Sequence, residues 1–444
     1  MNEDTIVAIA TGRMMAAISV IRVSGPHVFE FMKQIFKKDL TKVDSHTIHY
    51  GYIHDGDELI DEVLVMVYKG SRTFTGENMV EINCHGGVFI TNRVLETCLK
   101  YGARQANPGE FSQRAFLNGR IDLTQAESIS DLIESKTKEM STMALSGIRG
   151  SISKLIEDLN EELIKIITQI EVNIDYPEYL DIEELTAETL IPLTSTFITK
   201  LDHILKNARS GQILKEGIST AIVGKPNVGK SSLLNALLEE EKAIVTNVAG
   251  TTRDIVEGSI NLNGLVLNMI DTAGIHDTED LVESIGVNKS KEVLSKAQLV
   301  LLVLDASNPL TKEDYQLLEM TEDLNRIVIL NKCDLNKVID IDGIDISAKE
   351  NKIEALKEEI ERLFKLEKIT GNNEVLISNS RQIALLEQAK ISTQKAIDAM
   401  YMGIPTDLIV IDLYDAWKDL KEILGQEAKE DLLNELFSRF CIGK

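Results

Sequence analysis

The chain has 444 residues, of which 43% are hydrophobic and 27% are charged, and its formal net charge is −24 at pH 7. This length leaves room for two to four domains with ordinary apolar cores. The acidic balance disfavours a general nucleic-acid-binding protein, because phosphate contacts require local positive charge. Residues 1–120 hold 13 Lys and Arg against 14 Asp and Glu, so the other 34 basic and 57 acidic residues supply −23 of the total.

Residues 1–119 are predicted to form an N-terminal α+β domain, in which strands alternate with short helices. Gly, Asp and Asn punctuate four apolar stretches, which is typical of strands and the turns between them. The predicted strands are Thr5–Ala10, Ala17–Arg22, Leu64–Tyr68 and Met79–Ile82.

Residues 120–215 and 376–444 are predicted to be the two parts of a helical domain. Apolar residues recur at helical spacing between residues 152 and 170, and proline should end this helix near residues 175–177. The other predicted helices are about 184–210, Ser380–Met400, Leu408–Leu424 and Ala428–Phe440. The two parts most simply pack together as one bundle, and two separate bundles remain the alternative.

A phosphate-binding loop stands near the middle of the chain. Gly224–Ser231 reads Gly-Lys-Pro-Asn-Val-Gly-Lys-Ser and fits the pattern G-x-x-x-x-G-K-[ST]. It lies between the apolar run Thr220–Val223 and the helical segment Ser232–Leu237, which is the strand–loop–helix context that the motif requires. Backbone N–H groups and the helix N-terminus favour phosphate there. We expect Lys230 to contact the β- and γ-phosphates and the Ser231 hydroxyl to bind Mg²⁺.

Two later motifs indicate that the nucleotide is GTP and not ATP. Asp271-Thr-Ala-Gly274 follows the apolar run Leu265–Ile270, so Asp271 should lie at a strand end near the Mg²⁺. Asn331-Lys-Cys-Asp334 follows the apolar run Arg326–Leu330. An ionised Asp334 can accept hydrogen bonds from the two adjacent N–H donors of guanine, whereas adenine offers no matching donors.

The segment 216–375 is therefore predicted to form an inserted, Ras-like P-loop GTPase domain, with five or six strands alternating with helices. Ser347–Lys349 follows another short apolar stretch and should present a backbone N–H to guanine O6. The predicted nucleotide contacts are Asn227, Val228, Gly229, Lys230, Ser231, Ser232, Thr252, Asp271, Thr272, Ala273, Gly274, Asn331, Lys332, Asp334, Ser347, Ala348 and Lys349.

The hydrolytic apparatus differs from that of Ras-like GTPases. The residue after the Asp-Thr-Ala-Gly motif is Ile275, where Ras-like proteins have a Gln that orients the attacking water. Glu283 is a candidate for acting on that water, and a solvated acid at a helix start is the alternative. A monovalent cation beside the side-chain oxygen of Asn227 is the other candidate stabiliser. Thr246–Arg253 is a plausible covering loop, with Thr252 as a second Mg²⁺ ligand.

The compartment and the C-terminus are also open to interpretation. No apolar run approaches the roughly 18 residues of a membrane span, and the acidic N-terminus lacks the basic start of a signal peptide. The four cysteines have no CxxC spacing, so neither a zinc site nor a disulfide framework is indicated. A cytoplasmic protein without membrane association is expected. Cys441 does not fit a prenylation box, so it is either part of a frayed tail or a nucleophilic or redox thiol.

Over its whole length the chain resembles the MnmE (TrmE) family of tRNA uridine-modifying GTPases. The motifs that carry this resemblance are Phe74–Glu77, His85–Gly87, Pro108–Phe111, Arg114–Asn118, Asp122–Glu127 and Cys441–Lys444. The resemblance implies an N-terminal domain that binds a tetrahydrofolate derivative, in the 5,10-methylene or 5-formyl form, and that mediates homodimerisation. Family folate contacts correspond to Arg22, Glu81, Arg120 and Lys444, and Arg120 stands where some members have Lys.

The resemblance also implies a partner and a reaction. With an FAD-containing protein of the MnmG type, in a heterotetramer or larger complex, such proteins add an aminomethyl or carboxymethylaminomethyl group to C5 of the wobble uridine of certain tRNAs. The folate supplies the one-carbon unit. Cys441 matches a family cysteine that is important for this modification.

A potassium ion replaces the arginine finger in this family, and two GTPase domains pair across the nucleotide. The K⁺ ligands correspond to Asn227, Thr246, Val248 through its backbone, and Thr251, and the catalytic glutamate corresponds to Glu283. His276 departs from the Arg that many members have. Two other hypotheses remain: a regulatory GTP switch in ribosome assembly, and a folate-binding module with a degenerate nucleotide domain.

Overall fold

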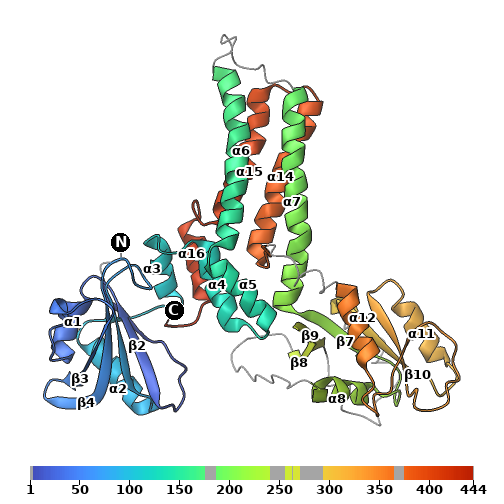
Figure 1. Ribbon diagram of the computed structural model, residues 1–444, viewed down its shortest axis with the longest axis horizontal. Coiled ribbons are helices and arrows are strands. Elements are labelled where there is room, and N and C mark those ends of the chain that lie inside the picture. The colour runs from blue at the N-terminus through green and yellow to red at the C-terminus, as the bar shows by residue number, and fades with distance from the viewer. Residues whose placement is uncertain are drawn as a thin grey trace. The chain divides into compact units, whose positions relative to one another are not determined.

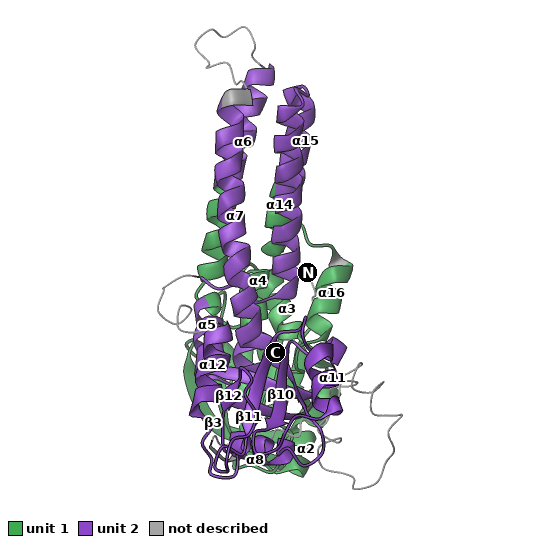
Figure 2. Ribbon diagram, turned by 90° about the vertical axis from the view of Figure 1, so that its right-hand side faces the viewer, with its two compact units in different colours: residues 1–130, 147–161, 417–444 green, residues 131–146, 162–416 purple. Residues whose placement is uncertain are grey.

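The computed structural model describes residues 4–175, 187–240, 256–262, 264–270, 294–364 and 375–443. The chain divides into two compact units (Figure 2). Unit 1 comprises residues 1–130, 147–161 and 417–444, and unit 2 comprises residues 131–146 and 162–416. The four-part domain division made from the sequence stays a prediction.

Unit 1 contains a six-stranded sheet in the order β3-β4-β5-β2-β1-β6. Figure 1 labels strands β2, β3 and β4 of this sheet. Its strands are β1 Ile6–Ile9, β2 Ile18–Ser24, β3 Thr47–Asp55, β4 Glu58–Tyr68, β5 Met79–His85 and β6 Arg104–Gln105. Neighbouring strands are antiparallel, except that β6 runs parallel to β1. The four strands expected from the sequence are present. The expectation missed β3 and β6, and it began β4 at Leu64 instead of Glu58.

The helices that begin in unit 1 are short, apart from α6. They are α1 Val28–Ile35, α2 Val88–Lys100, α3 Glu110–Leu117, α4 Leu123–Glu134, α6 Ser151–Asp175 and α16 Glu430–Ser438, with a 3₁₀ turn at Leu40–Lys42. Apolar residues of α1 and α2 form one core with the inward-facing residues of the sheet. A smaller cluster, in which Phe111 packs with Ile6 and Ala8, joins α3 to β1.

Long helices dominate one part of unit 2, which contains most of α6, all of α7 Ala187–Glu216 and α14 Ser380–Tyr401, and the first part of α15 Thr406–Ile423. These helices lie side by side in both views (Figures 1 and 2). α14 packs along α7, and the Tyr414 hydroxyl donates to Glu171 across 2.5 Å. Helices from the two predicted parts therefore pack into one bundle, as the sequence analysis favoured. The short α5, Lys138–Ile148, begins in the same unit.

The rest of unit 2 contains a second six-stranded sheet in the order β12-β11-β10-β7-β9-β8. Its strands are β7 Ile218–Val223, β8 Val256–Leu262, β9 Leu265–Ile270, β10 Leu299–Asp305, β11 Arg326–Asn331 and β12 Ile344–Asp345, and its helices are α8 Lys230–Glu240, α11 Lys312–Met320 and α12 Glu354–Phe364. All pairings are parallel except that of β8 with β9. Every residue of β10 is buried, as expected of a central parallel strand.

The six strands agree with the five or six expected for this domain. Because parallel strands end at a common edge, the loops after β7, β11 and β12 meet there, and these loops carry the nucleotide motifs. The fold is therefore multidomain, combining α/β and α+β parts with an all-α bundle. None of the helices that the structure describes is both long and apolar enough to cross a bilayer.

Candidate functional site

The loop between β7 and α8 has a backbone that only certain residues allow. Asn227 has a positive φ of 64°, and Gly229 has a φ of 104°. A Cβ at Gly229 would collide with the side-chain amide of Asn331, so the position requires glycine. Val228 between them is buried. The loop is therefore shaped by steric constraints on both sides of Val228.

Lys230 begins α8 and turns back into this loop. Its Nζ donates to the carbonyl of Gly224 at 2.8 Å and to that of Lys225 at 2.9 Å. Burial lowers the pKa of Lys230 below its usual value. Ser231 and Ser232 follow in the first turn of α8, where the helix N-terminus favours an anion. The predicted phosphate contacts thus surround one short loop.

Asn331 joins three loops through one buried side chain, which is only 2% exposed. Its Nδ2 donates to the carbonyl of Val228 at 2.8 Å, and its Oδ1 accepts from the backbone N–H of Ala348 at 3.1 Å. A side-chain amide can do both, because it carries a donor and an acceptor. The phosphate-binding loop and the predicted guanine loops are therefore fixed relative to each other.

Asp334 and Ser347 lie together at the predicted base site. The Ser347 hydroxyl donates to Asp334 Oδ1 at 2.7 Å. This hydrogen bond is the main reason that the pKa of Asp334 lies below its usual value. The carboxylate therefore remains ionised at neutral pH and keeps its second oxygen for further N–H donors. Lys349 adds a favourable charge nearby.

Lys332 connects the predicted guanine loop to the phosphate-binding loop. It has a positive φ of 67°, and its Nζ donates to the carbonyl of Asn227 at 2.8 Å and to Asp305 Oδ2 at 2.7 Å. Although burial raises the pKa of Asp305, hydrogen bonds from Lys332 and Ser307 hold it well below its usual range. Sequence analysis missed Asp305, although a lone carboxylate at the end of a fully apolar strand could have indicated it.

A second missed residue, Asp314, holds the phosphate-binding loop from the other side. Its Oδ2 accepts from Lys225 Nζ at 2.7 Å, and the Asp314 side chain is 1% exposed. The same oxygen accepts from the backbone N–H and the hydroxyl of Thr311, which caps α11. This carboxylate therefore ties Lys225 to a helix start that lies 89 residues further along the chain.

A cavity of about 260 Å³ opens in unit 1, and it is lined by His46, Tyr68, Arg72, Thr73, Phe74, Met79, Glu81 and Arg120. Arg22 lies opposite Glu81 on the neighbouring strand, and its Nε donates to Glu81 Oε1 at 2.9 Å. The Arg22 guanidinium also stacks 4.8 Å from the centre of the Phe74 ring. Two of the predicted folate contacts, Glu81 and Arg120, thus line one cavity, and a third, Arg22, pairs with Glu81.

The C-terminal tail is fixed beside this cavity by its backbone. Arg22 Nη1 donates to the carbonyl of Gly443 at 3.1 Å, and the backbone N–H of Gly109 donates to the carbonyl of Cys441 at 3.3 Å. Gly443 has a φ of 94°, and a Cβ there would collide with the carbonyl of Ile9. Cys441 itself is an exposed free thiol. The tail therefore reaches the same arginine that holds Glu81.

Comparison with known proteins identifies the family. A family profile described as "MnmE helical domain" matches residues 123–441, and one described as "GTP-binding protein TrmE N-terminus" matches residues 5–120. The chain belongs to the MnmE (TrmE) family. Relatives named tRNA modification GTPase MnmE come from Lactococcus lactis subsp. lactis, with 48% identity over 99% of this chain and 98% of theirs, and from Streptococcus gordonii, with 49% identity over 99% of both. The G domain of the T. maritima FeoB iron transporter, 30% identical, matches 33% of this chain and 98% of its own at a TM-score of only 0.24.

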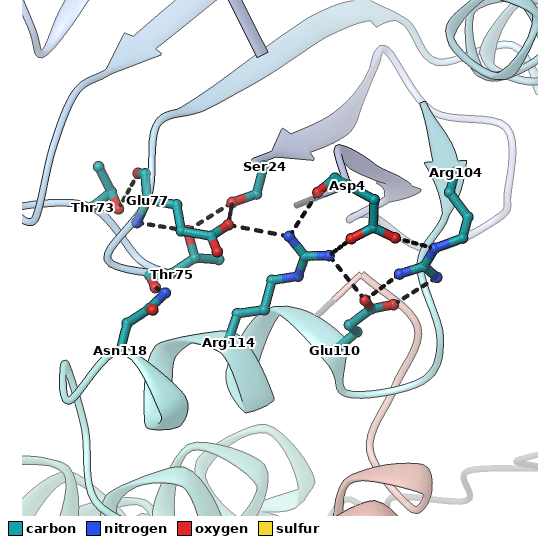
Figure 3. Close-up of polar contacts among 9 residues, drawn as sticks. All are labelled: Asp4, Ser24, Thr73, Thr75, Glu77, Arg104, Glu110, Arg114 and Asn118. Carbon is teal, nitrogen blue, oxygen red and sulfur yellow. Dashed lines mark hydrogen bonds and ion pairs between the residues drawn. The ribbon is translucent and has the colours of Figure 1, made fainter. Parts of the chain in front are cut away.

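The MnmE motifs of unit 1 contribute to a polar network around Arg114, which is buried and 3% exposed (Figure 3). Arg114 pairs with Asp4 at 2.6 Å, with Glu110 at 3.2 Å and with Glu77 at 3.3 Å. Glu110 also pairs with Arg104 at 2.5 Å. These contacts join the N-terminal segment, α3 and the loop between β4 and β5. Glu77 also accepts, through its carbonyl, a hydrogen bond from the hydroxyl of Thr73, which lines the cavity, so the network is linked to the cavity through this loop.

Several predicted MnmE site residues lie outside the described residues. They are Thr246, Val248, Thr251, Thr252, Asp271, Thr272, Ala273, Gly274, Glu283 and Lys444, together with Ile275 and His276. Their Mg²⁺, K⁺, hydrolytic and folate roles stay predictions. Within the described ranges, no three His, Cys, Asp or Glu side chains gather as a metal site.

Proposed function

We propose that this chain is a K⁺-stimulated GTP hydrolase that acts in the cytoplasm on the wobble uridine of certain tRNAs. With an FAD-containing partner of the MnmG type, it uses the one-carbon unit of a tetrahydrofolate to add an aminomethyl or carboxymethylaminomethyl group to C5. The observation that carries this proposal is the docking of the Cys441 tail on Arg22, beside Glu81 and Arg120. A simple GTP switch has no use for that arrangement.

The nucleotide loops fit GTP by their own chemistry. Lys230 points its ammonium group into the phosphate-binding loop, Gly229 leaves room for the Asn331 amide that fixes this loop, and Asp334 is an ionised acceptor for guanine. Ser231 and Thr252 would hold Mg²⁺, which supplies charge neutralisation at the phosphates. Asn227, Thr246, Thr251 and the backbone of Val248 would hold K⁺, and Glu283 would orient the attacking water.

The cavity of unit 1 fits a reduced folate. Glu81 can accept N–H groups of the pterin ring, because its carboxylate is oriented by Arg22. Tyr68 and Phe74 offer aromatic walls for flat rings. Arg120 brings positive charge to the mouth of the cavity, where the glutamate part of a folate carries its carboxylates. Lys444 would add a further cation.

The N-terminal sheet supports the homodimer that the family resemblance implies. Ile48, Tyr50 and Tyr52 alternate along the edge strand β3 and are exposed, and Leu64 pairs opposite Tyr50 on β4. An exposed apolar patch of this kind marks a protein interface. A second copy of the chain is the proposed occupant.

The decisive experiment measures GTP turnover in KCl and in NaCl, with and without the flavoprotein and a tetrahydrofolate. A rate that rises in KCl supports the proposal, and a rate indifferent to the cation contradicts the hydrolytic mechanism. Mass spectrometry of tRNA from a deletion strain tests the reaction itself. The wobble uridines of the deletion strain should lack the modification. If they are modified as in the wild type, the result favours the ribosome-assembly switch.

A further inference from the structure

One cation of the unit 1 cavity has no role in the function proposed so far. Arg72 lies in the loop between β4 and β5 and lines the cavity together with Arg120. The loop around it is held in place: Gly70 donates its N–H to Asn78 Oδ1 at 3.0 Å, and the Thr73 hydroxyl donates to the carbonyl of Glu77 at 2.7 Å. The backbone of Arg72 is therefore anchored on both sides.

Charge balance separates Arg72 and Arg120 from the other arginines around them. Arg22, Arg104 and Arg114 all pair with carboxylates. Among the residues that the structure describes, no carboxylate pairs with Arg72 or Arg120. Among the described residues that line the cavity, Glu81 is the only carboxylate, and it already pairs with Arg22. The cavity thus presents two guanidinium groups in excess, in a protein whose net charge is −24.

We propose that Arg72, acting with Arg120, binds the carboxylates of the glutamate tail of the reduced folate. This proposal rests on the proposed folate function. A guanidinium group matches a carboxylate through two parallel N–H donors, and a folate glutamate carries two carboxylates. Glu81 is better suited to the uncharged donors of the pterin ring. Both arginines are exposed at the mouth, so further γ-linked glutamates can extend into solvent past them.

The test compares two ligands that differ only in the tail. The full-length wild-type protein and Arg72→Gln are titrated calorimetrically with 5-formyltetrahydrofolate and with 5-formyltetrahydropteroate, which lacks the glutamate. Arg72→Gln should bind the folate about tenfold more weakly and the pteroate as well as the wild type does, since one charge-assisted contact is removed. Arg72→Lys should be intermediate, because it keeps the charge and loses the planar fork.

Arg93→Gln is the matched control. Arg93 belongs to the same unit but pairs with Glu58 and does not line the cavity, so both affinities should match those of the wild type. Equal folate affinity in Arg72→Gln and the wild type overturns the proposal, and so does equal weakening of both ligands, which indicates a general disturbance. If the wild type binds neither ligand, the folate function itself fails.

Ionic strength gives an independent readout on the wild type. Contacts between charges at an exposed mouth are screened by salt. Folate affinity should therefore fall with added salt more steeply than pteroate affinity, and this difference should shrink in Arg72→Gln. Parallel salt dependences of the two ligands would exclude a charged tail contact.

Discussion

The nucleotide loops of unit 2 and the cavity of unit 1 assemble their polar groups from different ranges of the chain. In unit 2, Lys230 bonds to carbonyls five and six residues earlier, inside its own motif. In unit 1, Arg22 meets Glu81 across 59 residues and Gly443 across 421. The nucleotide loops therefore depend on short sequence motifs, whereas the cavity of unit 1 depends on strand register and on the docking of the C-terminal tail.

The two sites should respond differently to substitutions. The phosphate-binding loop is fixed by backbone sterics at Gly229 and by one hub residue, Asn331. The cavity of unit 1 is supported by the ion network around Arg114, which involves no residue that lines the cavity. Damage to unit 1 should therefore begin as a loss of stability, and damage to the nucleotide loops as a loss of binding.

The largest effect is expected from Arg114→Leu. It leaves Glu110 and Glu77 without a buried cationic partner, and breaking such a pair costs about 3–5 kcal/mol. The only tryptophan, Trp417, lies in unit 1, so its fluorescence during urea titration reports on the unfolding of unit 1. Arg93→Leu, which breaks an exposed pair, should cost only about 0–1 kcal/mol. An equal loss of unfolding free energy in the two variants would mean that the Arg114 network does not stabilise unit 1.

Asp334→Asn tests the nucleotide loops of unit 2 and should leave the stability of unit 1 unchanged. The variant loses one charged acceptor for guanine, so GTP affinity should fall by about 10- to 100-fold. The new amide NH₂ can donate to the C2 carbonyl of xanthine, so affinity for xanthosine triphosphate should rise. Equilibrium binding of both nucleotides measures this exchange. Unchanged GTP affinity would show that the base is recognised elsewhere.

Asp305→Asn should have a smaller effect on the same loops. Lys332 loses its charged partner but keeps the carbonyl of Asn227, so GTP affinity should fall by about three- to tenfold. Asp342→Asn, which alters an exposed carboxylate of the same domain, is the control and should change nothing. If the two variants bind GTP alike, the Lys332–Asp305 pair does not position the loop.

The sequence could predict the features that depend on local motifs, but not those that depend on contacts between distant residues. The phosphate-binding loop, the guanine motif and the helical periodicity of α6 depend on neighbouring residues, and the strands and helices appear where these patterns indicated. The partners of Lys225 and Lys332 could not be predicted, because Asp314 and Asp305 reach them only after the sheet has formed. Local patterns do not encode such pairings.

The sheet of unit 1 shows the same limit. Strand β3 was missed because Gly51 and two histidines interrupt its apolar residues, and its exposed face carries Ile48 and Tyr50 instead of polar residues. The pairing of Arg22 with Glu81 depends on the register of β2 with β5. The family resemblance suggested these residues as folate contacts, but spacing alone did not place them together.

The smallest effect is expected at His85, where the same kind of charge pairing occurs on the surface. Asp61 Oδ1 lies 2.7 Å from His85 Nδ1, and this hydrogen bond raises the pKa of His85 above its usual value. A raised pKa means that the pair stabilises the fold below about pH 6.5 and that this contribution is lost as the pH rises through the folded pKa. NMR titration should show that Asp61→Asn lowers the pKa of His85, whereas Asp57→Asn does not. Because the ring is exposed, solvent screens the pair, and the unfolding free energy of Asp61→Asn should differ far less from the wild type than that of Arg114→Leu. A comparable loss at both positions would mean that burial is not what makes the Arg114 network important.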